Sequence, residues 1–389
     1  MALFVTTVLC VVFASFAILC QVYLLPLLTV LGTFRTVQTF GLDAAACTRI
    51  PELQACEKIV LVRPSGLLYL ACSTPESRLA WTPGMNQLNA EERSSDDYIA
   101  TYDSTTSKVA RLRLEDFDSD QPISVHGMDV VSSASNASEL FVYMINHRAP
   151  SGQDPRKVGA DSVIEVFKAT VSENRLFHIK TVRDPTIVSP NDIAGLADGK
   201  GFYFTNDHGS KAVYDSMIQN PWSATTSVGY CHIDHGCEIV ASGLPSSNGI
   251  LKASSNDTIY VSSSFGGKIT VFQKREDNSL SLMDVISIDQ VLDNLSIDNE
   301  DRLWVAAFPR ARDIKELLSK DLDHATPVAA FRISSNIGPS SNGEKYKVEK
   351  VLEDDGTIVS GSTSVAYDSD RNLLFMHGIV ARQLTVCRI

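Results

Sequence analysis

The sequence predicts an all-β fold, a six-bladed β-propeller with an N-terminal hydrophobic anchor helix. One observation behind this prediction is a short apolar run, rich in aromatic and β-branched residues and bounded by turn residues, that recurs six times. The six runs are Gly66–Cys72, Leu140–His147, Gly201–His208, Thr258–Ser264, Arg302–Phe308 and Asn372–Gly378. Their starts lie 44 to 74 residues apart, which fits one strand from each blade of four short strands. The other observation is a long uncharged segment at the N-terminus.

Further strand-like runs lie between the six and would supply the other strands of each blade. They include Val109–Leu114, Val163–Phe167, Lys268–Phe272 and Val328–Ile333. Residues 312–320 break this pattern, because their sequence is helical, and they are expected to decorate a loop. The alternative fold is a two-sheet sandwich, but a chain of this length would need two of them. No Pro- or Gly-rich linker separates two such domains.

The N-terminal segment, residues 1–34, contains no Asp, Glu, Lys, Arg or His, and the first charged side chain is Arg35. This exceeds both the about 20 residues that cross a bilayer and the apolar core of a signal peptide. Pro26 is expected to kink or end the helix, which makes residues 2–25 the better span. We expect an uncleaved signal-anchor rather than a removed signal, although Ala44–Ala46 is a candidate cleavage site. Residues 47–389 would then form one propeller domain.

Charge and cysteine content define the environment of this domain. The formal net charge of −12 argues against a nucleic-acid partner and suits a soluble domain that binds cations. Six cysteines lie outside the apolar span, and an even number in an exported chain predicts three disulfides. Asn136 and Asn256 open glycosylation sequons in polar surroundings. These features predict the secretory pathway, with the domain either membrane-anchored and facing the lumen or outside, or secreted.

The pairing of the cysteines is a set of hypotheses, since six cysteines allow about fifteen connectivities. Cys231 and Cys237 could belong to a zinc cluster with the two histidines between them, but the spacing is too tight and the compartment is oxidising. A disulfide across a hairpin is the better interpretation. The two outermost cysteines bracket the domain and would close the ring of a propeller, which leaves the third pair to tie the entry segment to the first repeated strand. These two pairs are Cys47 with Cys387 and Cys56 with Cys72.

Four short segments carry oxygen-bearing side chains in or beside strand-like runs. They are Asn191-Asp192, Asn206-Asp207-His208, Ser247-Asn248-Gly249 and Asp293-Asn294. A hard cation such as Ca²⁺ takes about six to eight oxygens from carboxylates and amide carbonyls. A ring-shaped fold would bring these segments to one axis. The alternative is that each is an ordinary turn stabilised by local hydrogen bonds.

These segments and their neighbours resemble the paraoxonase/arylesterase family. The matching stretches keep the family's order and near-family spacing over roughly residues 47–387. They are Val125–Gly127, Ile145–His147, Pro190–Ile193, Thr205–His208, Asn248–Ile250, Val291–Ser296 and Leu303–Val305. The resemblance implies a six-bladed propeller with two calcium ions in its central tunnel, which hydrolyses lactones and aryl esters. It also implies a hydrophobic N-terminus that is often kept and a ring-closing disulfide like Cys47–Cys387.

The resemblance also implies a ligand set for the catalytic calcium. By position, the ligands would be Glu57, Asn191, Asn248, Asp293 and Asn294. Two carboxylates and three amides fall short of a full oxygen shell, which would let the ion polarise a lactone carbonyl and stabilise the oxyanion. Asn294 also opens a formal glycosylation sequon, Asn-Leu-Ser. A residue that faces a tunnel metal cannot be glycosylated, so we interpret it as a ligand.

Two histidines are the expected catalytic bases. His126 matches the family's proposed general base, and His147 matches its partner in a two-histidine relay. An imidazole that titrates near neutrality can deprotonate the attacking water, and a second can relay the proton outward. The alternative is that both histidines cap strand ends. His208, directly after Asp207, is expected to support the tunnel rather than to take part in the chemistry.

Two residues depart from the family's pattern. Lys58 stands where the family has the second acidic residue of a pair, if one inserted residue is allowed before Gly66, and Asp192 matches the other carboxylate of that second calcium site. We expect the Lys58 ammonium to replace the second calcium and to pair with Asp192. Phe308 replaces a family histidine, which makes that wall of the pocket more apolar and favours hydrophobic lactones.

The expected function is therefore a calcium-dependent hydrolase of lactones, aryl esters or both, with one calcium rather than two. The expected partners are a small-molecule substrate and, through the N-terminal segment, a membrane; no residue pattern specifies an oligomeric state. The alternative is a catalytically weak propeller, similar to gluconolactonase or strictosidine synthase, that acts as a binding module or on another lactone.

Overall fold

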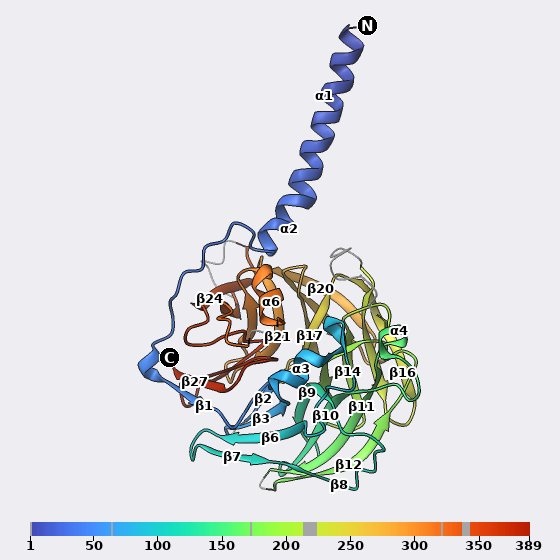
Figure 1. The fold of residues 1–389 in the computed structure, drawn as a ribbon, viewed down its shortest axis with the longest axis vertical. Helices are drawn as coiled ribbons and strands as arrows, with labels where there is room; N and C mark the ends of the chain where they lie inside the picture. The colour runs from blue at the N-terminus through green and yellow to red at the C-terminus, as the bar shows by residue number, and fades with distance from the viewer. Residues whose placement is uncertain (1, 64, 172, 213–223, 320–321, 337–342) are drawn as a thin grey trace.

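The structure is a computed structural model that describes residues 2–63, 65–171, 173–212, 224–319, 322–336 and 343–389. A long apolar helix stands away from a ring of β-sheets (Figure 1). The ring is the predicted six-bladed β-propeller, since its described strands form six main sheets of four or five strands each.

The four main strands of each blade are antiparallel, and the chain runs from the inner strand outward. The exceptions are an added fifth strand of blade 2, which pairs in parallel, and the outermost strand of blade 6, which comes from the N-terminal side of the domain. Blade 1 consists of β2 (Lys58–Val62), β3 (Leu67–Cys72), β6 (Tyr98–Asp103) and β7 (Lys108–Arg111). The main strands of blade 2 are β9 (Val125–Ser132), β10 (Glu139–Arg148), β11 (Asp161–Thr170) and β12 (Arg175–Val182). Blade 3 consists of β13 (Pro190–Gly195), β14 (Gly201–Asn206), β15 (Thr226–His232) and β16 (Gly236–Leu244). Blade 4 consists of β17 (Ser247–Lys252), β18 (Thr258–Ser263), β19 (Lys268–Lys274) and β20 (Leu280–Ser287). Blade 5 consists of β21 (Val291–Ile297), β22 (Leu303–Phe308), β23 (Val328–Ser335) and β24 (Tyr346–Asp354). Blade 6 consists of β25 (Ser364–Asp368), β26 (Leu373–His377), β27 (Leu384–Arg388) and β1 (Cys47–Ile50).

The six repeated apolar runs are the second strands of the six blades, namely β3, β10, β14, β18, β22 and β26. A second strand has a blade neighbour on each side and an adjacent blade on each face, so nearly all its side chains are buried. Every residue of β14 and β22 is buried, for example. This is why the second strand gives the strongest sequence signal.

One predicted strand is divided in the structure. Residues 109–114 were expected to form a single strand, but the chain leaves blade 1 at Arg111 and starts β8 (Arg113–Glu115), which pairs in parallel with β12 of blade 2. Leu112 is the crossing residue, and its N–H still donates to Ile99 of blade 1. The expectation of one strand is therefore wrong, because the run spans two blades.

The ring is closed by pairing the two ends of the propeller. β1 forms the outermost strand of blade 6 beside β27, and Cys47 lies directly opposite Cys387 in the register. All three expected disulfides are present: Cys47–Cys387, Cys56–Cys72 and Cys231–Cys237. The first joins residues 340 positions apart and locks the closing sheet.

The N-terminal helix continues beyond Pro26. It comprises α1 (Ala2–Leu19), a π-helical turn η1 (Cys20–Leu24) and α2 (Leu25–Val30). Of the two outcomes expected at Pro26, a kink or an end, the helix does not end there, but its regular α-helical hydrogen bonding is interrupted by the π-helical turn just before the proline. The wide turn moves the Leu25 N–H onto the Cys20 carbonyl, and Pro26 then occupies the first turn of α2, where a missing N–H costs nothing.

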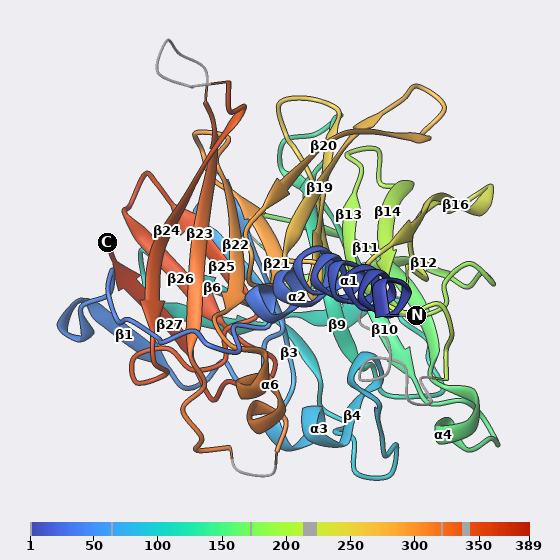
Figure 2. The ribbon, with the colours of Figure 1, turned by 90° about the horizontal axis from the view of Figure 1, so that it is seen from above.

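Short elements gather on one side of the propeller (Figure 2). They are α3 (Pro75–Ala80), β4 (Trp81–Thr82), η3 (Pro83–Met85), β5 (Gln87–Leu88), α4 (Pro155–Val158) and α6 (Ala311–Leu317), and η2 (Ala44–Ala46) precedes β1. α6 confirms the expected loop helix, although Lys320 of the predicted range lies outside the described residues.

Candidate active site

The site lies where the inner strands of the six blades surround the axis. Each inner strand contacts the inner strands of the two neighbouring blades, in the order β2, β9, β13, β17, β21, β25 and back to β2. In four consecutive blades the inner strand is bulged, so that two of its residues oppose one residue of the second strand. The bulged pairs are His126-Gly127, Asn191-Asp192, Asn248-Gly249 and Asp293-Asn294.

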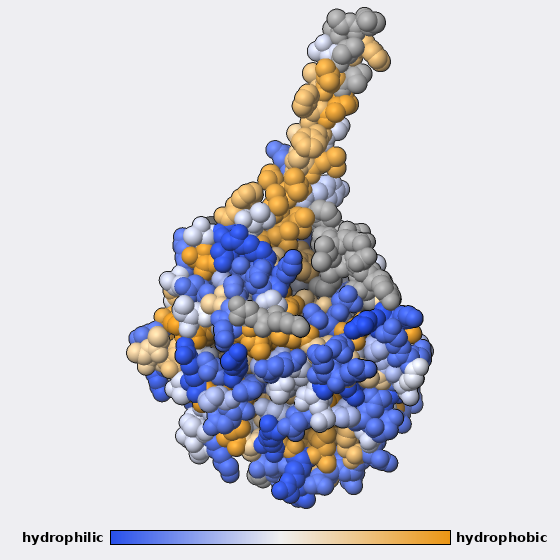
Figure 3. Space-filling model, viewed as in Figure 1, coloured by the Kyte–Doolittle hydropathy of each residue, from blue (hydrophilic) through white to orange (hydrophobic). Residues whose placement is uncertain are grey.

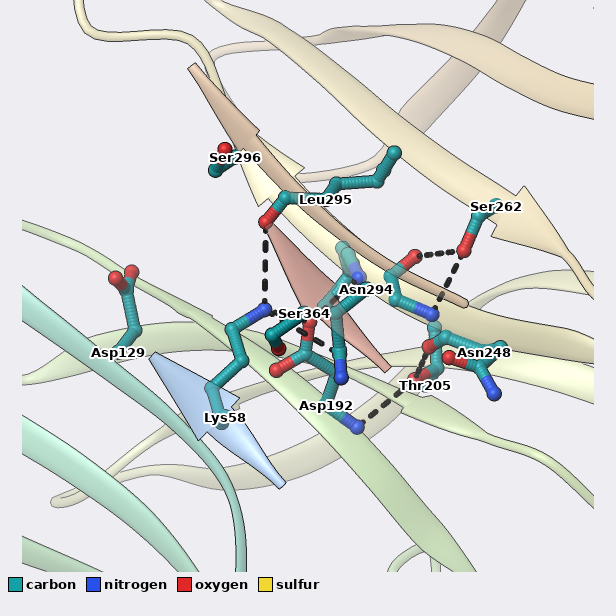
Figure 4. Close-up of polar contacts among 12 residues, drawn as sticks. Lys58, Asp129, Asp192, Thr205, Asn248, Ser262, Asn294, Leu295, Ser296 and Ser364 are labelled. Atoms are coloured by element: carbon teal, nitrogen blue, oxygen red, sulfur yellow. Dashed lines mark hydrogen bonds and ion pairs between the residues drawn. The ribbon is translucent and has the colours of Figure 1, made fainter. Parts of the chain in front are cut away.

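At two of the bulges, a hydroxyl group on the second strand forms hydrogen bonds with backbone groups of the inner strands that the bulge leaves unpaired. Thr205 accepts a hydrogen bond from the Asp192 N–H at 3.2 Å and donates to the Asn248 carbonyl of the next blade at 2.5 Å. Ser262 does the same one blade further, between the Gly249 N–H at 2.9 Å and the Asp293 carbonyl at 2.7 Å. These hydroxyls therefore fix the shape of the bulge and its position against the neighbouring blade (Figure 4).

The bulges bring inner strands so close that glycine is required. A Cβ atom on Gly127 would lie 2.2 Å from the Asn191 carbonyl oxygen of the next blade. This contact is far inside the van der Waals limit and involves backbone that cannot move away. Gly127 thus permits the two strands that carry His126 and Asn191 to meet.

A cavity of about 790 Å³ opens above these bulges. Its polar end is lined by Glu57, His126, Asn191, Asn248 and Asp293, and by Asp207 and His208. The structure therefore brings together segments that span more than two hundred residues of sequence. Asn294 lies directly beneath, almost fully buried, with its amide N–H donating to Glu57 at 2.6 Å.

Three of the predicted ligands have oxygens that are buried without a partner. They are Glu57 Oε2, Asn191 Oδ1 and Asn248 Oδ1. A buried acceptor without a donor costs about 1–3 kcal/mol, so native proteins rarely leave several together. Among the described residues, no group of three or more His, Cys, Asp or Glu side chains could hold a metal. A donor set of carboxylates and amides, however, is what a hard cation takes, and these residues fit it.

Burial opposes the ionisation of the carboxyl groups around the axis. Burial, together with the carboxylate of Glu57, raises the pKa of Asp293 well above its usual value. Burial likewise raises the pKa of Glu57, although Lys58 and Asn294 act in the opposite direction. Acids that resist ionisation when they are alone become good ligands once a cation is present, since the cation removes the penalty.

Lys58 lies below this polar end and is itself buried. Its ammonium donates to Asp192 Oδ2 at 2.6 Å, to Asn294 Oδ1 at 3.4 Å and to the Leu295 carbonyl at 3.5 Å (Figure 4). The side chains of Lys58 and Asp192 are 5% and 0% exposed. Burial still raises the pKa of Asp192 to about 6. The Lys58 ammonium, with three oxygens around it, thus supplies a positive charge in the inner part of the central axis. The ion pair between Lys58 and Asp192 that the sequence predicted is present.

His126 and His147 lie beside each other, with ring centroids 5.0 Å apart. His147 Nδ1 is 2.8 Å from the Ser162 hydroxyl, while His126 Nδ1 is buried without a partner. The expectation that His126 titrates near neutrality is wrong. Burial and the nearby Arg78 cation lower its pKa to about 3, so the ring stays neutral at physiological pH. Burial and His126 likewise lower the pKa of His147.

Asp207 and His208 form a second polar group at the cavity wall. His208 Nδ1 is 2.6 Å from Asp207 Oδ1, and Asn191 Nδ2 is 3.5 Å from Asp207 Oδ2. Burial opposes the charged form of His208, but the contact with Asp207 raises its pKa. Asp207 thus lies within reach of the Asn191 amide, and the supporting role of Asp207 and His208 stays a prediction.

Apolar side chains form the rest of the cavity. Phe308, at the end of β22, is 2% exposed and packs with Val30, Val291, Leu317 and Ile379. The cavity is also lined by Met85, Phe265, Leu292, Ile314 and Leu318. The cavity thus has a polar end at the axis and apolar walls elsewhere, and Phe308 is part of those walls as expected.

Two residues of the site could not be identified from the sequence. Arg78 of α3 is buried and donates to the carbonyls of Val125 and Ala55, which places a cation beside the histidine pair. Ser162 holds His147 because the β10–β11 register places them opposite each other. Neither residue belongs to a recognisable motif, and only the register or the fold could have revealed them.

The predicted glycosylation sites are on the surface. Asn136 and Asn256 are exposed, and each side-chain oxygen accepts a hydrogen bond from a backbone N–H two residues ahead. Asn294 is 1% exposed and therefore inaccessible in the folded protein, although it opens a sequon.

The fold and the site define a β-propeller with an oxygen-lined cavity at its axis. A family profile described as Arylesterase matches residues 44–389, so the chain belongs to the arylesterase family. Human serum paraoxonase/arylesterase 2 is 25% identical over 338 residues, which cover 86% of each chain. Human serum paraoxonase/arylesterase 1 is 24% identical over 369 residues, or 93% of each chain. Among solved structures, a luciferin-regenerating enzyme shares the fold, with a TM-score of 0.51 at 12% identity over 87% of this chain and 94% of that one.

Proposed function

We propose that this protein is a calcium-dependent hydrolase of lactones, aryl esters or both. The observation that carries the proposal is the group of unpartnered buried oxygens on Glu57, Asn191 and Asn248 at the polar end of the cavity. Membership of the arylesterase family supports the same class of reaction.

The calcium would be held by Glu57, Asn191, Asn248, Asp293 and Asn294. When bound, it would polarise the substrate carbonyl and stabilise the oxyanion that forms on attack by water. The chain's own contribution is to keep these ligands in place. Thr205 and Ser262 hold two of the bulges, and Asp207 orients the Asn191 amide.

His126 is the residue we propose to accept the proton of the attacking water. The His126 ring lines the cavity and is neutral, so one of its nitrogens can accept a hydrogen bond without first losing a proton. Its low pKa makes it a weak base, and its main contribution is then to orient the water and to take its proton as the new bond forms. His147 lies behind it and would carry the proton away, while Ser162 fixes the orientation of its ring.

The apolar walls favour substrates with an apolar tail. A lactone ring or ester at the polar end would place its substituent against Phe308, Phe265 and the residues of α6. Each buried methylene contributes about 0.8 kcal/mol. Hydrophobic lactones should therefore be better substrates than esters with polar leaving groups.

We propose one exchangeable calcium per chain. The Lys58 ammonium already occupies the inner oxygens of the axis, where it contacts Asp192, Asn294 and the Leu295 carbonyl. A second cation there would have to displace a buried ammonium from its carboxylate, which breaks a desolvated ion pair.

The first test is calcium binding to the full-length protein in detergent, by equilibrium dialysis after chelation. We expect one tightly bound ion. Asn248→Ala should weaken calcium binding at least about tenfold, which corresponds to the loss of one ligand. Asn299→Ala, on an exposed turn, is the matched control and should bind as the wild type does. Two tightly bound ions in the wild type would contradict the role of Lys58, and unchanged binding by Asn248→Ala would contradict the ligand set.

We also propose that residues 1–34 are a retained signal-anchor and that 47–389 is the catalytic domain, inside the secretory lumen or outside the cell. The disulfides and the apolar N-terminal helix fit the secretory pathway. Glycans at Asn136 and Asn256 belong to the same proposal.

A further inference from the structure

The N-terminal helix enters the propeller without a linker. Val30, the last residue of α2, is 6% exposed and packs against Gly267 and the cluster that contains Phe308. The Leu31 carbonyl accepts a hydrogen bond from the Ala311 N–H at 2.9 Å. The helix end is therefore part of the folded domain.

Arg35 fixes this junction from three directions. Its guanidinium donates to the carbonyls of Thr29 in α2 at 2.9 Å, Pro309 after β22 at 2.7 Å and Asp289 after β20 at 2.8 Å. The three acceptors belong to the helix and to two different blades. A planar group with several donors can join three carbonyls in one geometry, which makes the junction rigid.

The length of the helix determines where the propeller lies. The apolar span, Leu9–Val30, has 22 residues. At about 1.5 Å per residue, it is about 33 Å long, close to the about 30 Å of a bilayer's hydrocarbon core. Since Val30 is already inside the propeller, a helix that crosses the bilayer brings the surrounding surface to the lipid headgroups. The apolar helix meets the domain directly in Figure 3.

The strand beside this junction exposes an apolar patch. β20 is the outermost strand of blade 4, and Asp289 follows it at the Arg35 contact. Its side chains Leu282, Met283 and Val285 are 64%, 57% and 44% exposed. Met283 is the extra residue of a bulge opposite Val271 and Phe272.

Other outer strands lack such a patch. Among the described residues, β12, β16 and β24 each expose one large apolar side chain, Ile179, Ile239 and Val348 respectively. Single exposed apolar residues are normal on soluble surfaces, whereas three together on one strand indicate a contact surface. Figures 1 and 2 show that α1 leaves the rim of the propeller rather than either of its faces.

We propose that the protein docks edge-on on the bilayer: α1 spans it, and the outer face of β20, through Leu282, Met283 and Val285, rests in the headgroup layer. This inference depends on the proposed membrane anchoring. The partner is the lipid surface, and the Arg35 junction sets the orientation. The central axis of the propeller then lies along the membrane plane, because the rim rather than a face is in contact.

Fluorescence quenching by lipid tests this orientation in the full-length protein in phosphatidylcholine nanodiscs. An environment-sensitive dye is attached at Met283→Cys in a Cys10→Ser, Cys20→Ser background. A second sample carries the dye at Ile179→Cys on β12, another exposed apolar position, two blades away. Lipids with a quencher at shallow depth should reduce emission at position 283 about twofold and leave position 179 unchanged.

A dye at the native Cys20, in a Cys10→Ser background, reports insertion of the helix separately. Because Cys20 lies near the middle of the Leu9–Val30 span, this sample uses lipids with the quencher deep in the acyl chain. Quenching at Cys20 but not at position 283 overturns edge-on docking while anchoring stands. Absence of quenching at Cys20 overturns the anchoring and the docking together. Arg35→Ala should lower the quenching at position 283 and leave that at Cys20 unchanged, and equal quenching at position 283 in both proteins would overturn the role of the junction.

Discussion

At the residue scale, the type of site that the side chains form was easier to predict than the pKa and the contacts of each side chain. The oxygen bias of Asn191, Asn248 and Asp293 indicated a cation site, and the structure places these residues at one cavity. The pKa of His126 could not be predicted, because it depends on burial and on Arg78, a residue that lies far away in the sequence. The contacts of Lys58 were predictable only as a pair with Asp192, and its contacts with Asn294 and Leu295 required the fold.

His126→Gln should lower kcat for lactones by about a hundredfold, because glutamine keeps the size of the side chain but cannot take a proton. Calcium binding should be unchanged, since His126 is not among the proposed ligands. Steady-state kinetics and equilibrium dialysis measure the two effects separately. His235→Gln, at an exposed turn, is the control and should leave both unchanged. An unaltered rate on every lactone would show that His126 does not act as the base.

The Asp207–His208 pair should make stability depend on pH. The pKa of His208 is raised above 6.5, so its contribution is complete below pH 6.5 and disappears as the pH rises through the raised value. The pKa of Asp207 is lowered below 3.8: burial opposes this, but His208 outweighs it. Its contribution is complete above pH 3.8 and disappears as the pH falls through the lowered value.

The pair therefore stabilises the protein most between pH 3.8 and 6.5. With chelator present, the difference in melting temperature between wild type and Asp207→Asn should be larger at about pH 5 than at about pH 8.5. Equal differences at both values would contradict the ion pair.

At the element scale, apolar patterning located the second strand of every blade but not the inner strands. Four of the six inner strands are bulged, and their bulges carry Asn, Asp, His and Gly where a regular strand would have apolar residues. Their irregularity is the functional feature, because a bulge turns two side chains out of the ladder and towards the axis. A repeated pair of polar residues, each preceding an apolar run, is the signal by which these bulges could be found.

Among the three disulfides, we expect Cys47–Cys387, which closes the ring, to contribute most to the free energy of unfolding. Replacing Cys47 and Cys387 by Ser should lower the free energy of unfolding by up to about 5–6 kcal/mol, because the bond closes nearly the whole chain into a loop. The same replacement at Cys231 and Cys237, which close a short hairpin, should cost only about 2 kcal/mol. Denaturant unfolding measures both. Equal losses would show that ring closure contributes nothing beyond local packing.

At the scale of the whole molecule, the six repeated apolar runs predicted a ring of six blades. Because such a ring has one central axis, it also predicted that the distant oxygen-bearing segments meet there. The continuation of the N-terminal helix past Pro26 was not predicted, because it depends on a change of hydrogen-bond register before the proline. Nor did the sequence predict that the helix end is built into the wall that also contains Phe308. The second feature joins the end of the helix to the wall of the cavity.

The most direct test of the central claim is hydrolysis of a panel of lactones and aryl esters by the full-length protein, before and after chelation and after calcium is restored. The account predicts hydrolysis that is lost with chelator, recovered with calcium and fastest for lactones with apolar tails. Hydrolysis that persists in chelator would contradict metal-assisted catalysis, and calcium binding without any hydrolysis would identify the propeller as a binding module instead.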